Sequence, residues 1–313
     1  MSTETFRSLI SRNRRNSAIL LAAFGVLFVL IGWLIGEVWG GGDEGFRLGV
    51  PLAAAGVAFF LMLGSYYGGS SVLLGMSKAR EIRKSDDPQL FNVVEELCLA
   101  GGLPMPKVYV IDDTAMNAFA TGRDPAHAAV AITAGLRGKL TREELQGVIA
   151  HELSHVRHRD ILFATLVVVM VGTLVMLCDV FLRSMWWGGS RRSSRGRDRD
   201  SGGGAVKLVL LLVALVLAIL APILAKIIEM AISRQREYLA DAGSVELTRN
   251  PEGLAKALAK LEADPEVLEV ANRATAPLYI VHPIKSFEDR SKSLFDTHPP
   301  TSERIRRLRA LEV

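Results

Sequence analysis

Four apolar stretches interrupt an otherwise polar chain, at residues 18–38, 48–67, 161–182 and 206–224. Each has close to the ~20 residues that a helix needs to cross the hydrocarbon core of a membrane. Charged segments precede, separate and follow the two pairs of stretches. The pattern predicts about four transmembrane helices in two hairpins, interleaved with the two halves of a polar domain.

These hairpins set the predicted boundaries of four parts. Residues 1–69 form an N-terminal membrane hairpin, and residues 70–160 form the first half of the polar domain. Residues 161–228 form a hydrophobic helical hairpin around the stretch GGSRRSSRGRDRDSGGG, whose glycine, serine and charged residues are typical of a flexible loop. Residues 229–313 complete the polar domain.

The basic residues predict the orientation of the chain. They lie on both sides of the first hairpin: Arg7, Arg12, Arg14, Arg15, Lys78, Arg80, Arg83 and Lys84. Since cytoplasmic flanks carry the excess of lysine and arginine, we expect a multi-pass protein of the cell (inner) membrane, with the N-terminus and the polar domain in the cytoplasm. The arginines of the second loop oppose this rule. Residues 161–228 therefore either cross the bilayer, which we favour, or stay partly embedded on the cytoplasmic side.

Composition excludes several classes of protein. Half of the residues are hydrophobic, and the mean hydropathy is positive, as in membrane proteins. Two distant cysteines, Cys98 and Cys178, provide neither a disulfide framework nor a cysteine zinc cluster. The net charge of +4 comes from basic residues beside apolar stretches, so we expect no nucleic-acid partner. The chain has no G-x-x-x-x-G-K-[ST] loop, so we expect no bound nucleotide.

The polar domain contains patterns of both helix and strand. DDPQLFNVVEELCLAGG predicts a helix capped by Asp87, and KVYVID, NAFATG and AVAIT predict a small sheet. LTREELQGVIAHELSHVRHRD predicts a second helix, with a capping box of Thr141 and Glu144, that continues into the third apolar stretch. The fold class is α+β and mainly α, with a small β-sheet beside this helix.

The stretch HELSH on that helix has the H-E-x-x-H pattern of a metal site. His151 and His155 are one turn apart, so their imidazoles can bind one ion. Glu152 is rotated by about 100° from His151, beside an open coordination position, where it can take a proton from a water molecule. The same letters also occur on exposed charged helices. A third ligand is therefore needed to distinguish the two interpretations.

The third ligand has one candidate on a later helix. The metzincin pattern would place it at residue 161, but that residue is Ile161, so the metzincin class is excluded. In AISRQREYLADAGSVELT, Glu237 and Asp241 are one helical turn apart. Glu237 can complete a His₂Glu set, and Asp241 can hydrogen-bond a ligand histidine. The second hairpin leaves after His155 and returns before Glu237, which brings the two helices together.

Four motifs, MNAFATGRDP, HELSH, REYLADAGS and THPPTSERIRRL, resemble the HtpX family of membrane zinc metallopeptidases, relatives of the CAAX prenyl endoproteases. The resemblance covers nearly the whole chain and implies an integral membrane zincin-like metalloprotease. It implies one Zn²⁺ bound by His151, His155 and Glu237, with Glu152 as general base and Asp241 as partner of a ligand histidine.

The resemblance also implies roles for three further residues. Asn117 would lie on an edge strand that receives the substrate as an added strand. His298 would stabilise the oxyanion as a second catalytic residue, and Arg304 would orient Asp241 through a bidentate contact. Alternatively, Asn117 is a turn residue and His298, which precedes two prolines, only shapes a turn.

The function implied is a zinc-dependent endopeptidase that hydrolyses misfolded or damaged membrane proteins at the cytoplasmic face, in protein quality control during stress. The partners expected are polypeptide substrates and the lipid bilayer, and the sequence indicates no particular oligomeric state. Two alternatives remain: a processing protease of the CAAX prenyl-protein type, and a non-catalytic zinc-stabilised membrane scaffold. Glu152 argues against the scaffold, since a structural zinc site has no use for a base.

Overall fold

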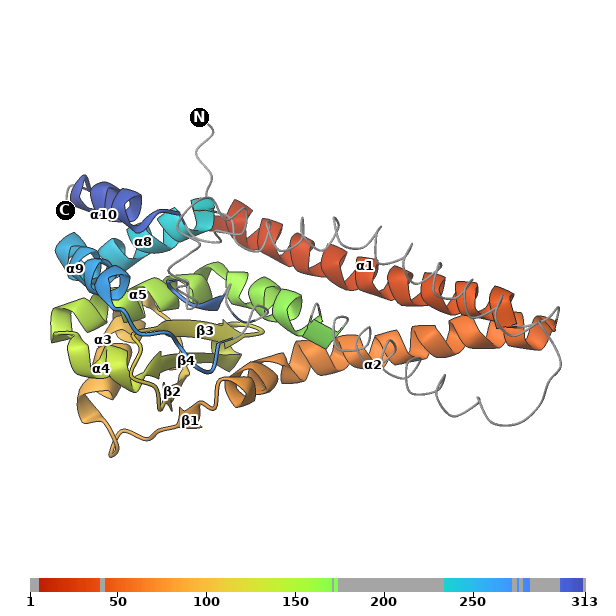
Figure 1. The fold of residues 1–313 in the computed structure, drawn as a ribbon. Coiled ribbons are helices and arrows are strands. Elements are labelled where there is room, and N and C mark those ends of the chain that lie inside the picture. The colour runs from red at the N-terminus through yellow and green to blue at the C-terminus, as the bar shows by residue number, and fades with distance from the viewer. Residues whose placement is uncertain are drawn as a thin grey trace. The chain divides into compact units, whose positions relative to one another are not determined.

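The computed structural model describes residues 6–39, 43–170, 172–173, 234–271, 275, 278–281 and 299–311 (Figure 1). Most of the predicted second hairpin, including the fourth apolar stretch and the arginine-rich loop, lies outside the described residues, and so does His298. The chain divides into two compact units. A polar unit comprises residues 1–17, 66–168 and 229–313, and an apolar unit comprises residues 18–65 and 169–228.

Two long helices account for the first two predicted membrane spans. Helix α1 is Phe6–Trp39, and helix α2 is Glu44–Met76. Ile10–Leu34 within α1 and the whole of α2 are long and apolar enough to cross a membrane. Large apolar side chains such as those of Leu52 and Phe60 are exposed on α2. Of the third predicted span, the structure describes a shorter apolar helix, Asp160–Met170.

A four-stranded mixed sheet forms the centre of the polar unit, in the order β1-β2-β4-β3. The strands are β1 (Arg80–Glu81), β2 (Lys107–Ile111), β3 (Ala118–Gly122) and β4 (Ala128–Thr133). Strand β4 is parallel to β2 and antiparallel to β3, which lies at the edge of the sheet. The three predicted strands are confirmed, and β1 was not predicted.

Both faces of the sheet are covered, because alternate residues pack into two separate cores. Ala118, Val130 and Ile132 belong to a large core that includes residues of the surrounding helices, whereas Phe119 and Ala131 belong to a smaller core with Tyr279. All residues of β3 and β4 are buried. This burial explains why these strands carry no charged residue and do not alternate apolar with polar positions, although each contains one buried threonine, Thr121 or Thr133.

Helices surround the sheet, and two of them, α3 and α5, begin at the predicted capping residues. They are α3 (Pro88–Gly101), α4 (Ala134–Lys139), α5 (Arg142–His158), α8 (Arg234–Thr248), α9 (Pro251–Ala263) and α10 (Thr301–Arg309), with a short 3₁₀ turn at Pro125–His127. Asp87 caps α3, and Thr141 and Glu144 form the predicted capping box of α5. Helix α5 packs against α3, α8, α9 and β3 (Figure 1).

Helix α5 does not continue into the third apolar stretch, contrary to the sequence prediction. It ends at His158, because Arg159 adopts a left-handed conformation with φ of 58°, and a new helix begins at Asp160. The carbonyl of His158 accepts a hydrogen bond from the Asn13 amide of α1 at 3.1 Å. This side chain satisfies one of the carbonyl groups that a helix end leaves without an intrahelical partner.

Candidate metal centre

Close packing between α5 and α8 brings the predicted ligands together. A Cβ atom on Gly243 of α8 would lie 2.5 Å from Oγ of Ser154 on α5, so the two helices can approach this closely only because residue 243 is glycine. Ser244 donates a hydrogen bond to the carbonyl of Gly147 at 2.8 Å. The small residues of ADAGS thus fix the face of α8 that is presented to α5.

His151, His155 and Glu237 converge at one point. Nε2 of His155 lies 3.2 Å from Nε2 of His151, and the Glu237 carboxylate lies 3.6 Å from His155 and 3.7 Å from His151. One ligand atom from each residue lies within 4.8 Å of the others. Two imidazoles and one carboxylate with an open fourth position form a donor set typical of catalytic zinc sites.

A buried carboxylate and a guanidinium hold His151. Asp241 Oδ1 lies 3.0 Å from Nδ1 of His151, so the other ring nitrogen faces the convergence point. Arg304 of α10 donates from Nε and Nη2 to the two oxygens of Asp241, at 2.9 and 2.6 Å. Arg304 is almost fully buried, and its Nη1 lies 3.5 Å from Glu237. A bidentate pair of this kind fixes both position and orientation.

The second histidine has a carboxylate partner that the sequence did not predict. Asp160 Oδ2 lies 3.0 Å from Nδ1 of His155. On a continuous helix, Asp160 would be rotated by about 140° from His155 and could not reach it. The break at Arg159 makes the contact possible. The one signal in the sequence was an aspartate at the border of an apolar stretch, because this residue type is favoured at helix N-termini.

The charged groups of the site change the pKa values of Glu152 and His155. Burial raises the pKa of Glu152 to about 7, and the Glu237 charge adds to this rise, while His155 and Arg304 oppose it. Burial alone would lower the pKa of His155. The charge and hydrogen bond of Asp160, and then Glu237 and Glu152, outweigh burial and raise that pKa to about 10. The acidic groups around His155 therefore stabilise positive charge on its ring.

The charge balance also fits a divalent metal ion. Four carboxylates and two guanidinium groups meet at the site: those of Glu152, Asp160, Glu237, Asp241, Arg236 and Arg304. With all four carboxylates ionised and the histidines neutral, as metal ligands are, these groups leave a surplus of two negative charges, which a divalent ion would neutralise. Arg236, which was not predicted either, is buried with its guanidinium over the ring of Phe163.

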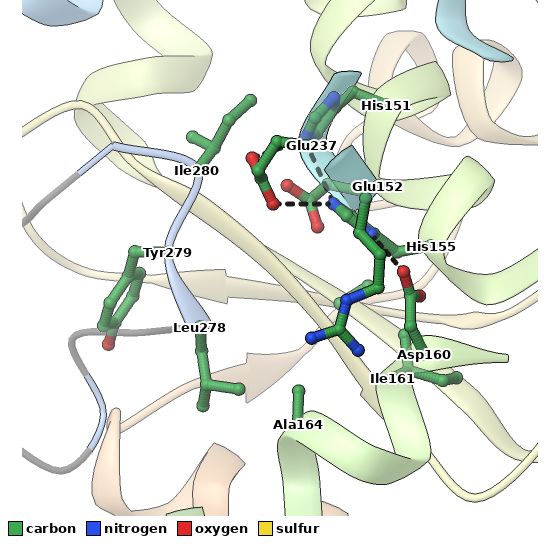
Figure 2. A pocket seen from close by; sticks show the side chains of 12 residues that line it. His151, Glu152, His155, Asp160, Ile161, Ala164, Glu237, Leu278, Tyr279 and Ile280 are labelled. Carbon is green, nitrogen blue, oxygen red and sulfur yellow. Dashed lines mark hydrogen bonds and ion pairs between the residues drawn. The ribbon is translucent and has the colours of Figure 1, made fainter. Parts of the chain in front are cut away.

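A pocket of about 50 Å³ adjoins the ligands. Figure 2 shows Leu278, Tyr279 and Ile280 on one side of this pocket and Asp160 and Ile161 on the other. Asn117, predicted to bind substrate, directly precedes β3, and its side-chain amide donates to the carbonyl of Val281 at 3.0 Å. The 278–281 segment carried no role in the sequence predictions, because LYIV has no polar side chain besides the tyrosine hydroxyl.

Comparisons with known proteins identify the class of protein to which this fold and this site belong. Residues 84–312 match the model of peptidase family M48, and the chain belongs to that family. It is a membrane metalloendopeptidase, and its substrates are polypeptides.

The chain is also similar to proteins described as Protease HtpX homolog. The one from Streptococcus uberis is 44% identical over 306 residues, covering 96% of this chain and 98% of that protein. The one from Dictyoglomus thermophilum is 43% identical over 311 residues, covering 99% and 96%. The chain is also similar to a crystal structure of S. mikatae Ste24p, with 18% sequence identity and a TM-score of 0.48. The match covers 96% of this chain and 66% of the Ste24p chain.

Proposed function

We propose that this metalloendopeptidase binds one zinc ion through His151, His155 and Glu237 and uses Glu152 as its general base. The observation that carries the proposal is the convergence of three ligand atoms within 4.8 Å beside a carboxylate whose pKa is about 7. The nitrogen and oxygen donors, the formal charge and the raised pKa of His155 all favour a divalent cation at this point.

A zinc ion held there would supply Lewis acidity to the attacking water and the scissile carbonyl. Glu152 removes the proton from the water with its carboxylate and donates it to the leaving amine nitrogen. A pKa near 7 suits both steps, because the group can then exist in either protonation state at neutral pH. Asp241 and Asp160 keep Nδ1 of each histidine hydrogen-bonded, which directs Nε2 toward the metal.

Arg304 holds Asp241 in this arrangement, and His298 is the proposed oxyanion donor. Asn117 and the edge of β3 bind the substrate main chain. The predicted domain boundaries place the site in the two polar segments, 70–160 and 229–313. No covalent acyl-enzyme forms in this scheme, because water is the nucleophile.

The substrates we propose are misfolded or damaged membrane proteins, cut at the cytoplasmic face of the cell membrane. Two observations favour this assignment: the apolar helices α1 and α2, and the arginines and lysines that flank them. Labelling of Leu99→Cys, an exposed position on α3, by a membrane-impermeant thiol reagent from each side of the membrane tests the orientation.

The test of the chemistry compares wild type with Glu152→Gln. Both proteins are purified in detergent with chelator, reloaded with zinc and given unfolded casein. We expect about one zinc per chain in both, and a fall in kcat/KM of about 10²- to 10⁴-fold in Glu152→Gln, because a positioned general base contributes this much. Glu143→Gln, an exposed glutamate on the same helix, is the matched control and should cleave casein at the wild-type rate.

Three results would count against the proposal. Full activity in Glu152→Gln would remove Glu152 as the base. Stoichiometric zinc in wild type without cleavage of any unfolded substrate would favour the scaffold alternative. Cleavage restricted to prenylated peptides would favour the processing alternative.

A further inference from the structure

The 278–281 segment makes main-chain contacts with the edge of the sheet. The N–H of Ile280 donates to the carbonyl of Ala118, the first residue of edge strand β3, at 3.1 Å. The carbonyl of Val281 accepts from the side-chain amide of Asn117 at 3.0 Å. These contacts involve backbone atoms of the segment, so they would be available to any extended polypeptide in the same place.

The segment is also held from its other side. Arg304 donates from Nη1 to the carbonyl of Ile280 at 3.2 Å. The hydroxyl of Tyr279 lies 3.2 Å from Oγ of Ser77. The Tyr279 ring packs edge-on against the Phe119 ring, with 5.3 Å between the ring centroids. Tyr279 and Ile280 are 1% and 2% exposed. The segment therefore occupies a formed binding site for two apolar side chains and their main chain.

The position of the segment limits the space beside the ligands. Leu278, Tyr279 and Ile280 line the same pocket as Glu152 and Glu237 (Figure 2). The segment forms one wall of this pocket, whose volume is about 50 Å³. In the sequence, Pro277 and Pro283 flank the segment, and neither has a backbone N–H that could add to the pairing with β3.

We propose that Leu278–Val281 is an internal stand-in for a substrate strand, and that an extended apolar stretch of polypeptide displaces it from β3. The two compete for the same groups, the Ala118 carbonyl and the Asn117 amide. Once the segment has left, the Arg304 guanidinium and the apolar residues that surrounded Tyr279 and Ile280 can contact the ligand. This inference rests on the proposed function, since the ligand is the substrate of that site.

Such an occupant selects among ligands. A folded protein cannot supply a free strand of about four residues, whereas an unfolded chain can. The side chains of the stand-in, Leu, Tyr, Ile and Val, indicate that the favoured ligand is apolar. Only molecules in which the segment has left β3 can bind a ligand there. The apparent affinity is therefore the intrinsic affinity multiplied by the fraction of molecules in that state.

The first experiment measures binding rather than hydrolysis. The full-length Glu152→Gln protein, loaded with zinc in detergent, is titrated into fluorescently labelled unfolded casein. Ile280→Pro in this background removes the N–H that holds the segment on β3. Since one backbone hydrogen bond contributes roughly two- to tenfold to an equilibrium constant, casein should bind about two- to tenfold more tightly. Ile280→Val keeps the N–H and is the matched control.

Casein binding that is unchanged or weaker in a folded Ile280→Pro protein would overturn the proposal. Zinc content and thermal melting establish that the variant is folded. The absence of casein binding to all three proteins would also overturn it. Suppose instead that casein binds more tightly to Ile280→Pro but is not hydrolysed by zinc-loaded wild type. That result would contradict the proposed function, but it would still support displacement of the 278–281 segment from β3.

A second measurement requires no change in the segment. Hydrogen exchange at the Ile280 amide is followed in zinc-loaded Glu152→Gln protein, with and without saturating casein. We expect the amide to be protected without casein and to exchange at least several-fold faster with it, because the segment has left β3. Equal protection of Ile280 in the casein complex would show that the segment is a permanent part of the sheet.

Discussion

The two units of the molecule bury opposite kinds of residue. The polar unit buries charge: Glu152 and Arg304 are 2% and 1% exposed. The apolar unit exposes hydrocarbon, and Leu52 and Phe60 of α2 are each 72% exposed. In the first unit, neighbouring side chains provide the partners that water would otherwise provide, whereas in the second the bilayer solvates the apolar surface. A hydropathy pattern thus predicts the surroundings of a segment, and not simply whether its side chains are buried.

The largest effect should come from removing a charge in the polar unit. Arg304→Met leaves Asp241 as a buried carboxylate without its bidentate partner. Removing one member of a buried ion pair costs about 3–5 kcal/mol, so we expect a marked fall in the thermal melting temperature of the detergent-purified protein. Arg306→Met on the same helix is the control, since the Arg306 side chain is 74% exposed and surface pairs contribute about 0–1 kcal/mol.

The double variant Arg304→Met/Asp241→Leu sharpens this test. Removing both charged groups should recover part of the lost stability, because the remaining side chains are then both apolar. A double variant less stable than Arg304→Met alone would show that Asp241 is stabilised chiefly by His151.

An intermediate effect should come from adding a charge to the apolar unit. Phe60→Lys places an ammonium group near the middle of α2, where insertion of a lysine costs about 2.5–3.5 kcal/mol. We expect a smaller fraction of the protein in washed membranes. Leu99→Lys, at a position 79% exposed on α3, should leave that fraction unchanged. Equal behaviour of the two variants would mean that α2 does not face lipid.

The smallest effect should come from a charge that touches a ligand without binding the metal. Asp160→Asn keeps the size of the side chain beside Nδ1 of His155 but removes its negative charge. Loss of such a partner typically lowers metal affinity about 10- to 100-fold, measurable by competition with a chromophoric chelator. Glu246→Gln, which breaks a surface pair with Arg157, should keep the wild-type affinity. The same affinity in both variants would make Asp160 irrelevant to the metal.

Local signals predicted much of the fold. Asp87 with Pro88 marked the start of α3, and the Thr141–Glu144 capping box marked the start of α5. Short branched and aromatic runs marked β2, β3 and β4. These features depend on neighbours within a few residues, and so they are visible in the sequence.

Long-range features of the site could not be predicted in the same way. The contact between Asp160 and His155 depends on Arg159, a non-glycine residue with positive φ, for which the sequence has no distinct signal. The pairing of Ile280 with Ala118 joins residues far apart in the chain through backbone atoms that every residue has. By contrast, the Glu237 position could be proposed because it follows an apolar hairpin that begins at the H-E-x-x-H helix and lies one helical turn before Asp241.

The helix break at Arg159 has a consequence for insertions and deletions. Loops between helices usually tolerate a change of length, because slack in the chain absorbs it. Here the residue after the break, Asp160, begins the apolar helix and also contacts His155, a proposed metal ligand. One residue more or fewer between His155 and Asp160 would turn that carboxylate away from the imidazole. The chain length between His155 and the third apolar stretch is therefore fixed by this contact, because a change of one residue would remove a partner of His155.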